Sequence, residues 1–412
     1  WQTVSRSSTT GEQSDKIAII EFYQLDHHLF AFTNHYYQQP QAHLSMIGIT
    51  GTNGKTSICQ LIARLLEHNG KQAAVIGTNG NGRLDALTST LNTTPAATYL
   101  HQLLTEYIDQ GISHVAMEVS SHALSQGRVS AELFAIAVYS NLSHEHLDYH
   151  KTMKNYAAAK RQIFSGHKHQ MAILNGDDKY SQLWLTDWPQ EQDYLVYGRS
   201  AAIKHHAKYL YASNIVHHSH GVSFTLQMMD ASIEVKSSLM GDFNIDNLLA
   251  AIAVLYVQGI SLTDIVAAVS SLSPVIGRME SFTALNKATA IVDYAHTPDA
   301  LHNALLACRQ HCSGDLWVVF GCGGERDVDK RPVMGGIAEK YAQHIVLTND
   351  NPRSETPETI VNNILSGCHQ PDKVTVILER QQAVLFALKQ AKANDIVLLA
   401  GKGHEAYILQ GD

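Results

Sequence analysis

The sequence predicts a multidomain α/β protein, and three observations support this fold class. An apolar run at residues 46–50 gives way to glycine and polar residues and then to a helical pattern. Strand-like and helix-like segments alternate from that point on, as they do in proteins built on parallel sheets. The chain has 412 residues, which is too long for one ordinary hydrophobic core and predicts two or three domains.

Breaks in this alternation predict three domains. We expect a short N-terminal part at residues 1–44, a central phosphate-binding domain at residues 45–273 and a C-terminal Rossmann-like domain at residues 274–412. Pro274 marks the second boundary, because a fresh α/β pattern begins after it.

The central domain opens with MIGITGTNGKTS at residues 46–57, which predicts a buried strand, a phosphate-binding loop and the first turn of a helix. Glycines let backbone N–H groups approach phosphate oxygens, a lysine adds positive charge, and a threonine hydroxyl is suited to Mg²⁺. The strict pattern G-x-x-x-x-G-K-[ST] is not met, since Ile49 takes the place of its first glycine and Gly48 lies one residue too early. The loop predicts a nucleotide triphosphate, with contacts from Gly51, Thr52, Asn53, Gly54, Lys55, Thr56 and Ser57.

Two further strands of this domain are predicted at residues 113–119 and 135–142, and both end in polar residues. Open α/β sheets bind ligands at the carboxyl ends of their strands. Glu118 ends the first strand and is a candidate ligand of Mg²⁺. The second strand leads into NLSHEHLDYH at residues 141–150, which is dense in metal-capable side chains, although solvated loop histidines are an equal alternative in a chain with 24 histidines.

The remaining elements follow in order. Alternation between residues 195 and 240 predicts an antiparallel hairpin appended to the parallel sheet, and a helix is expected at residues 244–257. Strands of the C-terminal domain are expected at residues 290–293, 317–320, 344–347, 374–378 and 396–400.

Composition narrows the possible partners. A formal net charge of −8 without a basic run argues against nucleic acid. No window approaches the ~18 apolar residues that a membrane span needs, so no membrane insertion is expected. The five cysteines are odd in number and lack C-x-x-C spacing, which disfavours a zinc site or a disulfide framework. We expect a soluble protein of the reducing cytoplasm.

Taken together, the motifs resemble the Mur ligase family, whose relatives include folylpolyglutamate synthases. The resemblance covers nearly all of residues 45–405 and is closest to the branch that adds the third residue of the peptidoglycan stem peptide. It is carried by TGTNGKTS at 50–57, TTP at 93–95, MEVSSHAL at 117–124, NLSHEHLDYH at 141–150, YAAAKRQIF at 156–164, GDFNIDN at 241–247, GRME at 277–280, DYAHTPDAL at 293–301, GCGGERD at 321–327, DNPR at 350–353 and GKGHE at 401–405.

The resemblance implies an ATP-dependent ligase of cell-wall precursor synthesis. In the family, ATP phosphorylates a substrate carboxylate, and an amine then displaces the phosphate. The implied partners are ATP, UDP-N-acetylmuramoyl-L-alanyl-D-glutamate and meso-2,6-diaminopimelate, with two Mg²⁺ ions as cofactors and a monomer as the default state.

The resemblance also implies roles for catalytic residues. Lys55 would steady the γ-phosphate, Thr56 and Glu118 would bind one Mg²⁺, and His146 would bind a second. Lys160 matches the carbamylated lysine (N6-carboxylysine) of the family, whose anionic carbamate supports the second ion. From the residues alone, Lys160 would be interpreted as a solvated helix residue.

Three further sets of residues match ligand contacts of the family. The ATP contacts around the domain junction are Asn244, Asn247, Arg278, Asp293 and His296. The contacts of the nucleotide-sugar dipeptide are Thr93, Thr94, Ser120, Gln126 and Arg128. The contacts of diaminopimelate are Arg326, Asp350, Asn351, Pro352, Arg353, Gly401 and Glu405.

The choice of amino acid rests on Arg353. Diaminopimelate carries a distal carboxylate that lysine lacks, so an arginine in its pocket favours diaminopimelate and would be left unpaired by lysine. Glu405 could take the distal ammonium.

Other functions stay open. The alternatives are a lysine-adding ligase of the same family, a folylpolyglutamate-synthase-like ligase and a non-catalytic nucleotide-binding protein. The uridine-binding domain of the family is normally longer than the stretch before residue 45, so we expect the N-terminal part to be incomplete and assign no uridine contacts.

Overall fold

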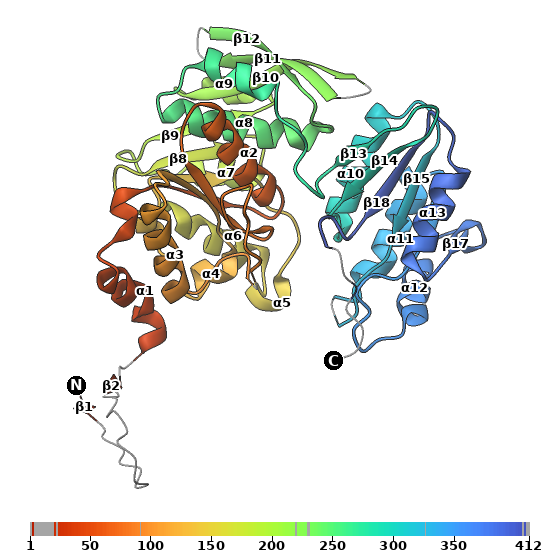
Figure 1. The fold of residues 1–412 in the computed structure, drawn as a ribbon, viewed down its shortest axis with the longest axis horizontal. Coiled ribbons are helices and arrows are strands. Elements are labelled where there is room, and N and C mark those ends of the chain that lie inside the picture. Colours follow the sequence, from red (N-terminus) through yellow and green to blue (C-terminus); the bar gives the residue numbers. More distant parts are fainter. Residues whose placement is uncertain are drawn as a thin grey trace.

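The computed structural model describes residues 2–3, 20–21, 24–90, 92–218, 221–228, 231–325, 327–405 and 408. Most of these residues form two lobes, each built around its own sheet (Figure 1). A small antiparallel pair, β1 (Gln2–Thr3) and β2 (Ile20–Glu21), stands apart from both sheets. The predicted α/β class is confirmed, while the domain boundaries remain our proposal.

The central lobe contains a ten-stranded sheet. Its strands, in spatial order, are β12 (Ala231–Ser237), β11 (Gly221–Met228), β10 (Tyr209–His218), β9 (Tyr194–Gly198), β8 (Met171–Asn175), β7 (Ile136–Tyr139), β3 (Ser45–Thr50), β6 (His114–Glu118), β4 (Ala73–Gly77) and β5 (Gly80–Gly82). Neighbours from β10 to β4 are parallel, and the pairs at both edges are antiparallel. The predicted hairpin is therefore part of a three-stranded extension, because β11 pairs with strands on both of its sides.

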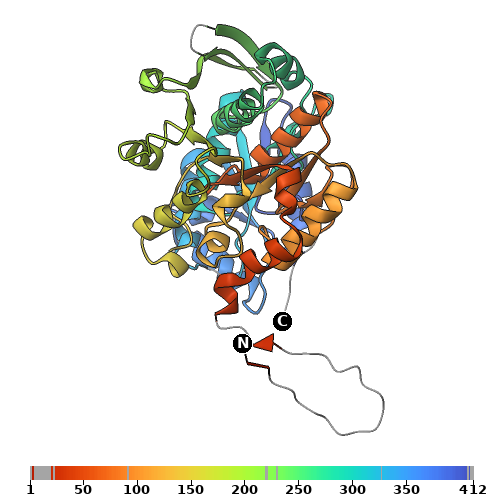
Figure 2. The ribbon, with the colours of Figure 1, turned by 90° about the vertical axis from the view of Figure 1, so that its left-hand side faces the viewer.

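Helices cover both faces of this sheet (Figure 2). One hydrophobic cluster includes α2 (Lys55–His68), α8 (Asp242–Val257) and α9 (Leu262–Val269). The opposite cluster includes α1 (Leu25–Tyr36), α3 (Ala97–Asp109), α4 (Ser121–Ser125), α6 (Met153–Arg161) and α7 (Lys179–Leu185). Shorter elements are α5 (Leu147–His150) and the 3₁₀ turns η1 (Pro40–His43), η2 (Ala131–Leu133), η3 (Gln162–Phe164) and η4 (Ala201–His205).

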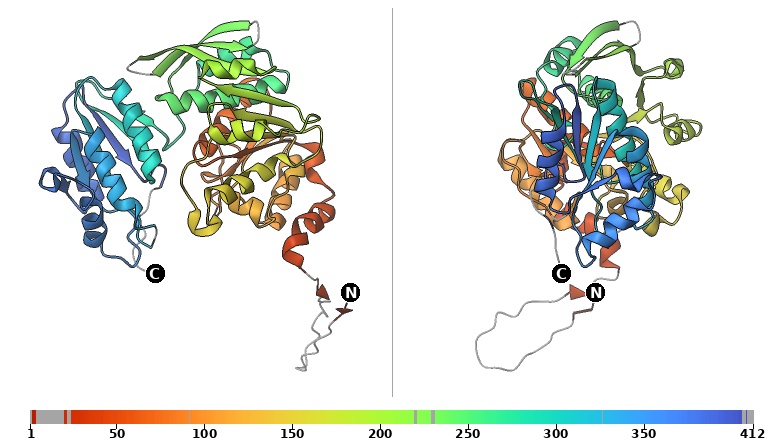
Figure 3. Two further views of the ribbon diagram at one scale, coloured as in Figure 1. Left: turned by 180° about the vertical axis from the view of Figure 1, so that it is seen from behind. Right: turned by 90° about the vertical axis from the view of Figure 1, so that its right-hand side faces the viewer.

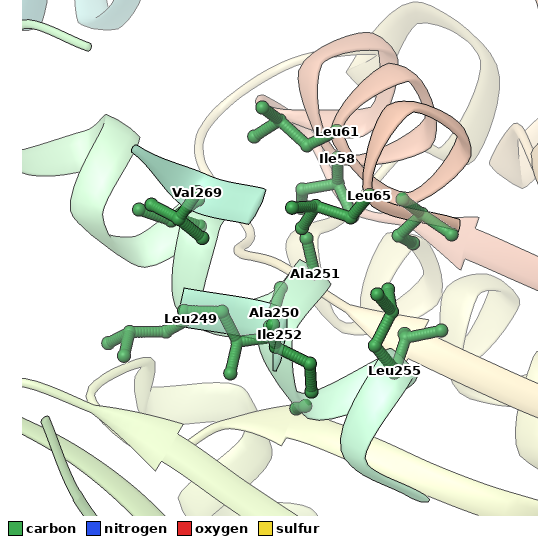
Figure 4. Packing of buried hydrophobic residues seen from close by; sticks show 14 of the residues in the cluster. Ile58, Leu61, Leu65, Leu249, Ala250, Ala251, Ile252, Leu255 and Val269 are labelled. Carbon is green, nitrogen blue, oxygen red and sulfur yellow. The ribbon is translucent and has the colours of Figure 1, made fainter. Parts of the chain in front are cut away.

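The contact between α2 and α8 anchors the helix that follows the phosphate loop. Residues 248–255 of helix α8 are all apolar and buried, as expected for a helix segment with core on every side, and the helix lies against α2 (Figure 4). Ile58, Leu61 and Leu65 of α2 are completely buried there. The start of α2, which carries the loop, is thereby held at a fixed place above the sheet.

The C-terminal lobe has a six-stranded sheet, which Figure 3 shows in its right-hand view. Its order is β13 (Glu280–Phe282), β14 (Thr289–Asp293), β18 (Ile396–Ala400), β15 (Leu316–Phe320), β16 (His344–Leu347) and β17 (Thr375–Val376). All pairs are parallel except β13 with β14. Its helices are α10 (Pro298–His311), α11 (Lys330–Tyr341), α12 (Pro357–Leu365) and α13 (Arg380–Gln390), and η5 (Pro371–Lys373) precedes β17.

The C-terminal strands agree with the sequence prediction apart from two differences. The strand expected at residues 374–378 keeps only two residues in the sheet, and β13 was not anticipated because its three residues show no alternating pattern. None of the helices in the described part of the chain is both long and apolar enough to cross a membrane.

Leu65 provides a test of the α2–α8 contact. Replacing this buried side chain with alanine removes apolar contacts and leaves a cavity, so Leu65→Ala should lower the free energy of unfolding by about 2–5 kcal/mol in urea denaturation. The matched control is Leu285→Ala, since Leu285 is 90% exposed and its loss should change stability by less than about 0.5 kcal/mol. Equal effects of the two variants would contradict this packing.

Candidate active site

The phosphate loop lies between the end of β3 and the start of α2. Gly51 and Gly54 have φ angles of +153° and +89°, and a Cβ on either residue would collide with the side chain of Ser140 or Asn247. Glycine is therefore required at both positions. Thr52 N–H donates to the Asn141 carbonyl at 2.8 Å, which joins the loop to the segment after β7.

The departure from the strict loop pattern has a structural reason. Gly48 lies within β3, and a Cβ there would come within 2.8 Å of the Phe134 ring. Ile49 is completely buried in the core. Both residues thus serve the packing of the strand, and the phosphate-binding turn begins only at Gly51.

Two lysines converge on one carbonyl oxygen of this loop. Lys55 Nζ and Lys160 Nζ each donate to the Gly51 carbonyl at 2.8 Å, and Lys55 also donates to the Thr52 carbonyl at 2.8 Å. Burial lowers the pKa of Lys55 and lowers the pKa of Lys160 well below its usual value, and the positive charge of Lys55 adds to the shift at Lys160. Lys160 is therefore a buried amine beside the loop and not a solvated helix residue.

Glu118 lies at the end of β6 with its side chain directed at the next strand. It is 2% exposed, and its carboxylate accepts hydrogen bonds from the Thr78 N–H at 2.8 Å and the Thr78 hydroxyl at 3.2 Å. Gly77 makes room for it, because a Cβ at that position would collide with the carboxylate. A cavity of about 10 Å³ beside Glu118 is also lined by Thr56.

The donors around this point fit Mg²⁺. Thr56 and Glu118 offer the hard oxygen atoms that Mg²⁺ prefers, and such sites take their other ligands from phosphates and water. Within the described ranges, no group of three or more His, Cys, Asp or Glu side chains could hold a metal without such help. His146 precedes α5 with a φ of +57°, and its ring lies 5.0 Å from the His122 ring and 5.9 Å from the Tyr156 ring.

The residues matched to the nucleotide-sugar dipeptide gather next to Glu118. The Thr93 hydroxyl lies 3.0 Å from the Thr78 hydroxyl, and the Thr94 hydroxyl donates to the Glu118 carbonyl at 2.8 Å. Ser120 N–H donates back to the Thr94 hydroxyl at 3.0 Å. Arg128 contacts both the Thr94 carbonyl and the Gln126 side chain.

The residues matched to ATP come from both lobes. Asn244 and Asn247 are buried in α8 and joined by a 3.0 Å hydrogen bond, and the Asn247 side chain lies against Gly54. Arg278 of the C-terminal lobe donates to the Thr56 hydroxyl at 3.2 Å. His296 is exposed, and its Nδ1 lies 2.8 Å from the Tyr294 carbonyl.

Asp293 and Asp299 make contacts of different kinds. The Asp293 carboxylate accepts the backbone N–H groups of Met279 and Ala295 at 2.8 Å each, so it holds the backbone around the end of β14. Asp299, in the first turn of α10, accepts a hydrogen bond from the Asn53 side chain at 2.9 Å. This second contact joins the C-terminal lobe directly to the phosphate loop.

The residues matched to diaminopimelate cluster at the carboxyl ends of β16 and β18, except Arg326, which lies outside the described residues. Asp350 and Asn351 are buried, and the Asn351 amide donates to Glu405 at 3.2 Å. Gly401 has a φ of +105° and packs against the Asp350 carboxylate. Arg353 has a φ of +52° and donates to the Gly324 carbonyl at 2.6 Å, while the Pro352 carbonyl lies close to Gly324.

An ion pair between a buried arginine and a partly exposed glutamate, which the sequence did not reveal, lies next to this pocket. Arg331 is completely buried, and its two terminal nitrogens each lie 2.8 Å from a different oxygen of Glu355. Glu355 also accepts the Glu325 N–H at 2.6 Å, so the pair joins the loop before Arg326 to the loop after Arg353. Neither partner belongs to a motif quoted from the sequence, and no spacing rule predicts a pair between these two segments.

Comparisons with known proteins identify the family to which the chain is similar. The Mur ligase middle domain matches residues 49–255, and the Mur ligase glutamate ligase domain matches residues 277–403. UDP-N-acetylmuramoyl-L-alanyl-D-glutamate--2,6-diaminopimelate ligase from Vibrio vulnificus (strain YJ016) is 46% identical over 391 residues, covering 95% of this chain and 78% of that relative. The enzyme of that name from Haemophilus influenzae (strain ATCC 51907 / DSM 11121 / KW20 / Rd) is 42% identical, covering 96% and 80%.

A solved structure of an enzyme with that name superposes with a TM-score of 0.69 at 38% identity, covering 94% of this chain and 79% of its own. Fold, phosphate loop and sequence similarity together define an ATP-dependent ligase. The chain belongs to the Mur ligase family.

The Arg331–Glu355 pair predicts a dependence of stability on pH. The hydrogen bonds from Arg331 hold the pKa of Glu355 at about 2, below its ordinary value of 4.5. Because the pKa of Glu355 is lower in the folded state, its ionised carboxylate stabilises the fold at pH values above 4.5. This stabilisation is lost as the pH falls from 4.5 toward 2. The urea midpoint of the wild type should therefore fall more steeply over this range than that of Glu355→Gln.

The control for that measurement is Glu358→Gln, which changes an exposed glutamate in the first turn of α12. It should keep the wild-type slope. An unchanged slope in Glu355→Gln would contradict the stabilising role of the pair.

Proposed function

We propose that this protein uses ATP to join meso-diaminopimelate to the D-glutamate of UDP-N-acetylmuramoyl-L-alanyl-D-glutamate. One observation carries the proposal. The C-terminal lobe holds the charged pocket matched to diaminopimelate, and the same lobe contacts the phosphate loop and the start of α2. Arg278 and Asp299 make that link, through Thr56 and Asn53. Similarity along almost the whole chain to ligases of this name supports the choice of substrates.

The proposed reaction uses both the phosphate loop and the amino-acid pocket. An oxygen of a D-glutamate carboxylate attacks the γ-phosphorus of ATP, ADP leaves, and an acyl phosphate forms. The amine nitrogen of diaminopimelate then attacks the acyl carbon, loses a proton, and displaces phosphate. Negative charge develops on the phosphoryl oxygens, where Lys55 and the N–H groups of the loop would offset it.

Two Mg²⁺ ions are part of the proposal. Thr56 and Glu118 would bind one, and His146 with a carbamylated Lys160 would support the other. Bound Mg²⁺ would neutralise charge on the phosphates. The lowered pKa of Lys160 favours the carbamate, because only a neutral amine can attack CO₂.

The remaining residues bind and orient substrates in this proposal. Arg128 would pair with a carboxylate of the dipeptide substrate, and Arg353 with the distal carboxylate of diaminopimelate. Glu405 would take the distal ammonium. The proposed substrates are a nucleotide, a nucleotide sugar and a free amino acid, so we place the reaction in the cytoplasm. A monomer is proposed from the family resemblance alone.

The choice of amino acid is tested by phosphate release with Mg-ATP and the UDP-dipeptide. We expect kcat/KM for meso-diaminopimelate to exceed that for L-lysine by at least about 100-fold, because lysine brings no distal carboxylate to the charge of Arg353. Reactions without the UDP-dipeptide are the control and should release no phosphate above background. Turnover with lysine would favour the lysine-adding alternative, and activity with neither amino acid would favour a folylpolyglutamate-type or non-catalytic protein.

The role of Lys160 is tested by Lys160→Ala. Loss of the amine removes the carbamate, so kcat should fall by about 100-fold or more while the protein remains folded by circular dichroism. Lys154→Ala is the matched control, since Lys154 lies on the same helix and is exposed. Full activity of Lys160→Ala would exclude the proposed role.

A further inference from the structure

Tyr294 lies between the two predicted binding sites of the C-terminal lobe. It follows β14 directly after Asp293, and its ring face lies 4.5 Å from the Arg278 guanidinium. Its hydroxyl donates to Glu405 Oε1 at 3.2 Å. One side chain therefore contacts both a residue matched to ATP and a residue matched to diaminopimelate.

The position of Tyr294 is fixed by packing. A Cβ on Gly403 would come within 2.8 Å of the Tyr294 Cβ, so the backbone of the GKGHE segment lies directly on the residue. The His296 and His404 rings lie 4.8 Å and 5.6 Å from the Tyr294 ring. A side chain held on this many sides can fix the groups that it contacts.

At Glu405, the Tyr294 hydroxyl acts on one oxygen only. Oε1 accepts from Tyr294, whereas Oε2 accepts from the Asn351 amide and from Lys402 Nζ, each at 3.2 Å. Donors on both oxygens fix the rotation of the carboxylate. Without the hydroxyl, the side of the carboxylate toward Tyr294 would lose its directional contact.

Arg278 contacts the face of the Tyr294 ring and not its hydroxyl. The guanidinium spans from the Tyr294 ring to the Thr56 hydroxyl in the other lobe, and its Nε is buried without a hydrogen-bond partner. Because this nitrogen makes no hydrogen bond, it does not help to orient the guanidinium. The cation–π attraction to the Tyr294 ring therefore contributes a larger share of the orienting interactions. This attraction depends on an aromatic ring and not on the hydroxyl.

We propose that Tyr294 is a positioning residue that aligns the nucleotide contact Arg278 with the amino-acid contact Glu405. The ring orients the arginine and the hydroxyl orients the glutamate, so the two substrates meet groups set by a single side chain. This inference rests on the proposed function, which supplies the identity of the amino acid.

Two variants separate the two roles of Tyr294. Tyr294→Phe keeps the ring and removes the hydroxyl, so KM for meso-diaminopimelate should rise about tenfold while KM for ATP changes less than about twofold. Tyr294→Leu removes both, so KM for ATP should also rise, by about fivefold. Tyr341→Phe, at the far end of α11, is the control and should match the wild type.

A residue with only a structural role would lower the melting temperature without this split between substrates. Unchanged KM for diaminopimelate in Tyr294→Phe, or equal rises of both KM values in that variant, would overturn the inference. If the wild type is inactive with every amino acid, the proposed function fails separately. In that case the role of the Tyr294 ring is tested by the affinity for Mg-ADP. Equal affinities of the wild type and Tyr294→Leu would overturn that role.

Discussion

The convergence of two buried lysines on the Gly51 carbonyl is the interaction on which the site depends. It fixes a loop that has few side chains of its own, and it brings Lys160 from a helix more than one hundred residues away in the sequence. Burying two amines near each other is unfavourable unless each has a partner. The shared Gly51 carbonyl supplies a partner to both amines.

Packing explains why this arrangement is held in place. Helix α2 is fixed on α8, and the strands that end at the loop, at Glu118 and at Ser140 are central strands of the sheet. The backbone that carries these side chains is thus built into the sheet and the helix packed on it. Binding residues positioned by a rigid scaffold are common in α/β proteins.

Local patterns predicted the α/β fold, which the structure confirms, and they also predicted part of the candidate site. Alternation of strands and helices predicted the sheet, and Glu118 was proposed because a carboxylate at the end of a strand that follows a phosphate loop is the usual second anchor for Mg²⁺. Arg331, Lys402 and Tyr294 could not be found in this way, since their roles arise from partners in other loops. Arg331 meets Glu355 and Tyr294 meets Glu405, and no spacing rule predicts either pair. Gly48 was interpreted only as a misplaced loop residue, because the Phe134 ring that requires it comes from a distant turn.

The hydrogen bond between Asn53 and Asp299 has a consequence for the interpretation of mutational data. Asp299 belongs to α10 and contacts the loop that is expected to hold phosphate. A substitution in α10 can therefore shift nucleotide affinity by changing how the two lobes hold the loop. Weakened nucleotide binding in such a variant would not identify α10 as part of the nucleotide pocket, and a double-mutant cycle with Asn53 would be needed to assign the effect.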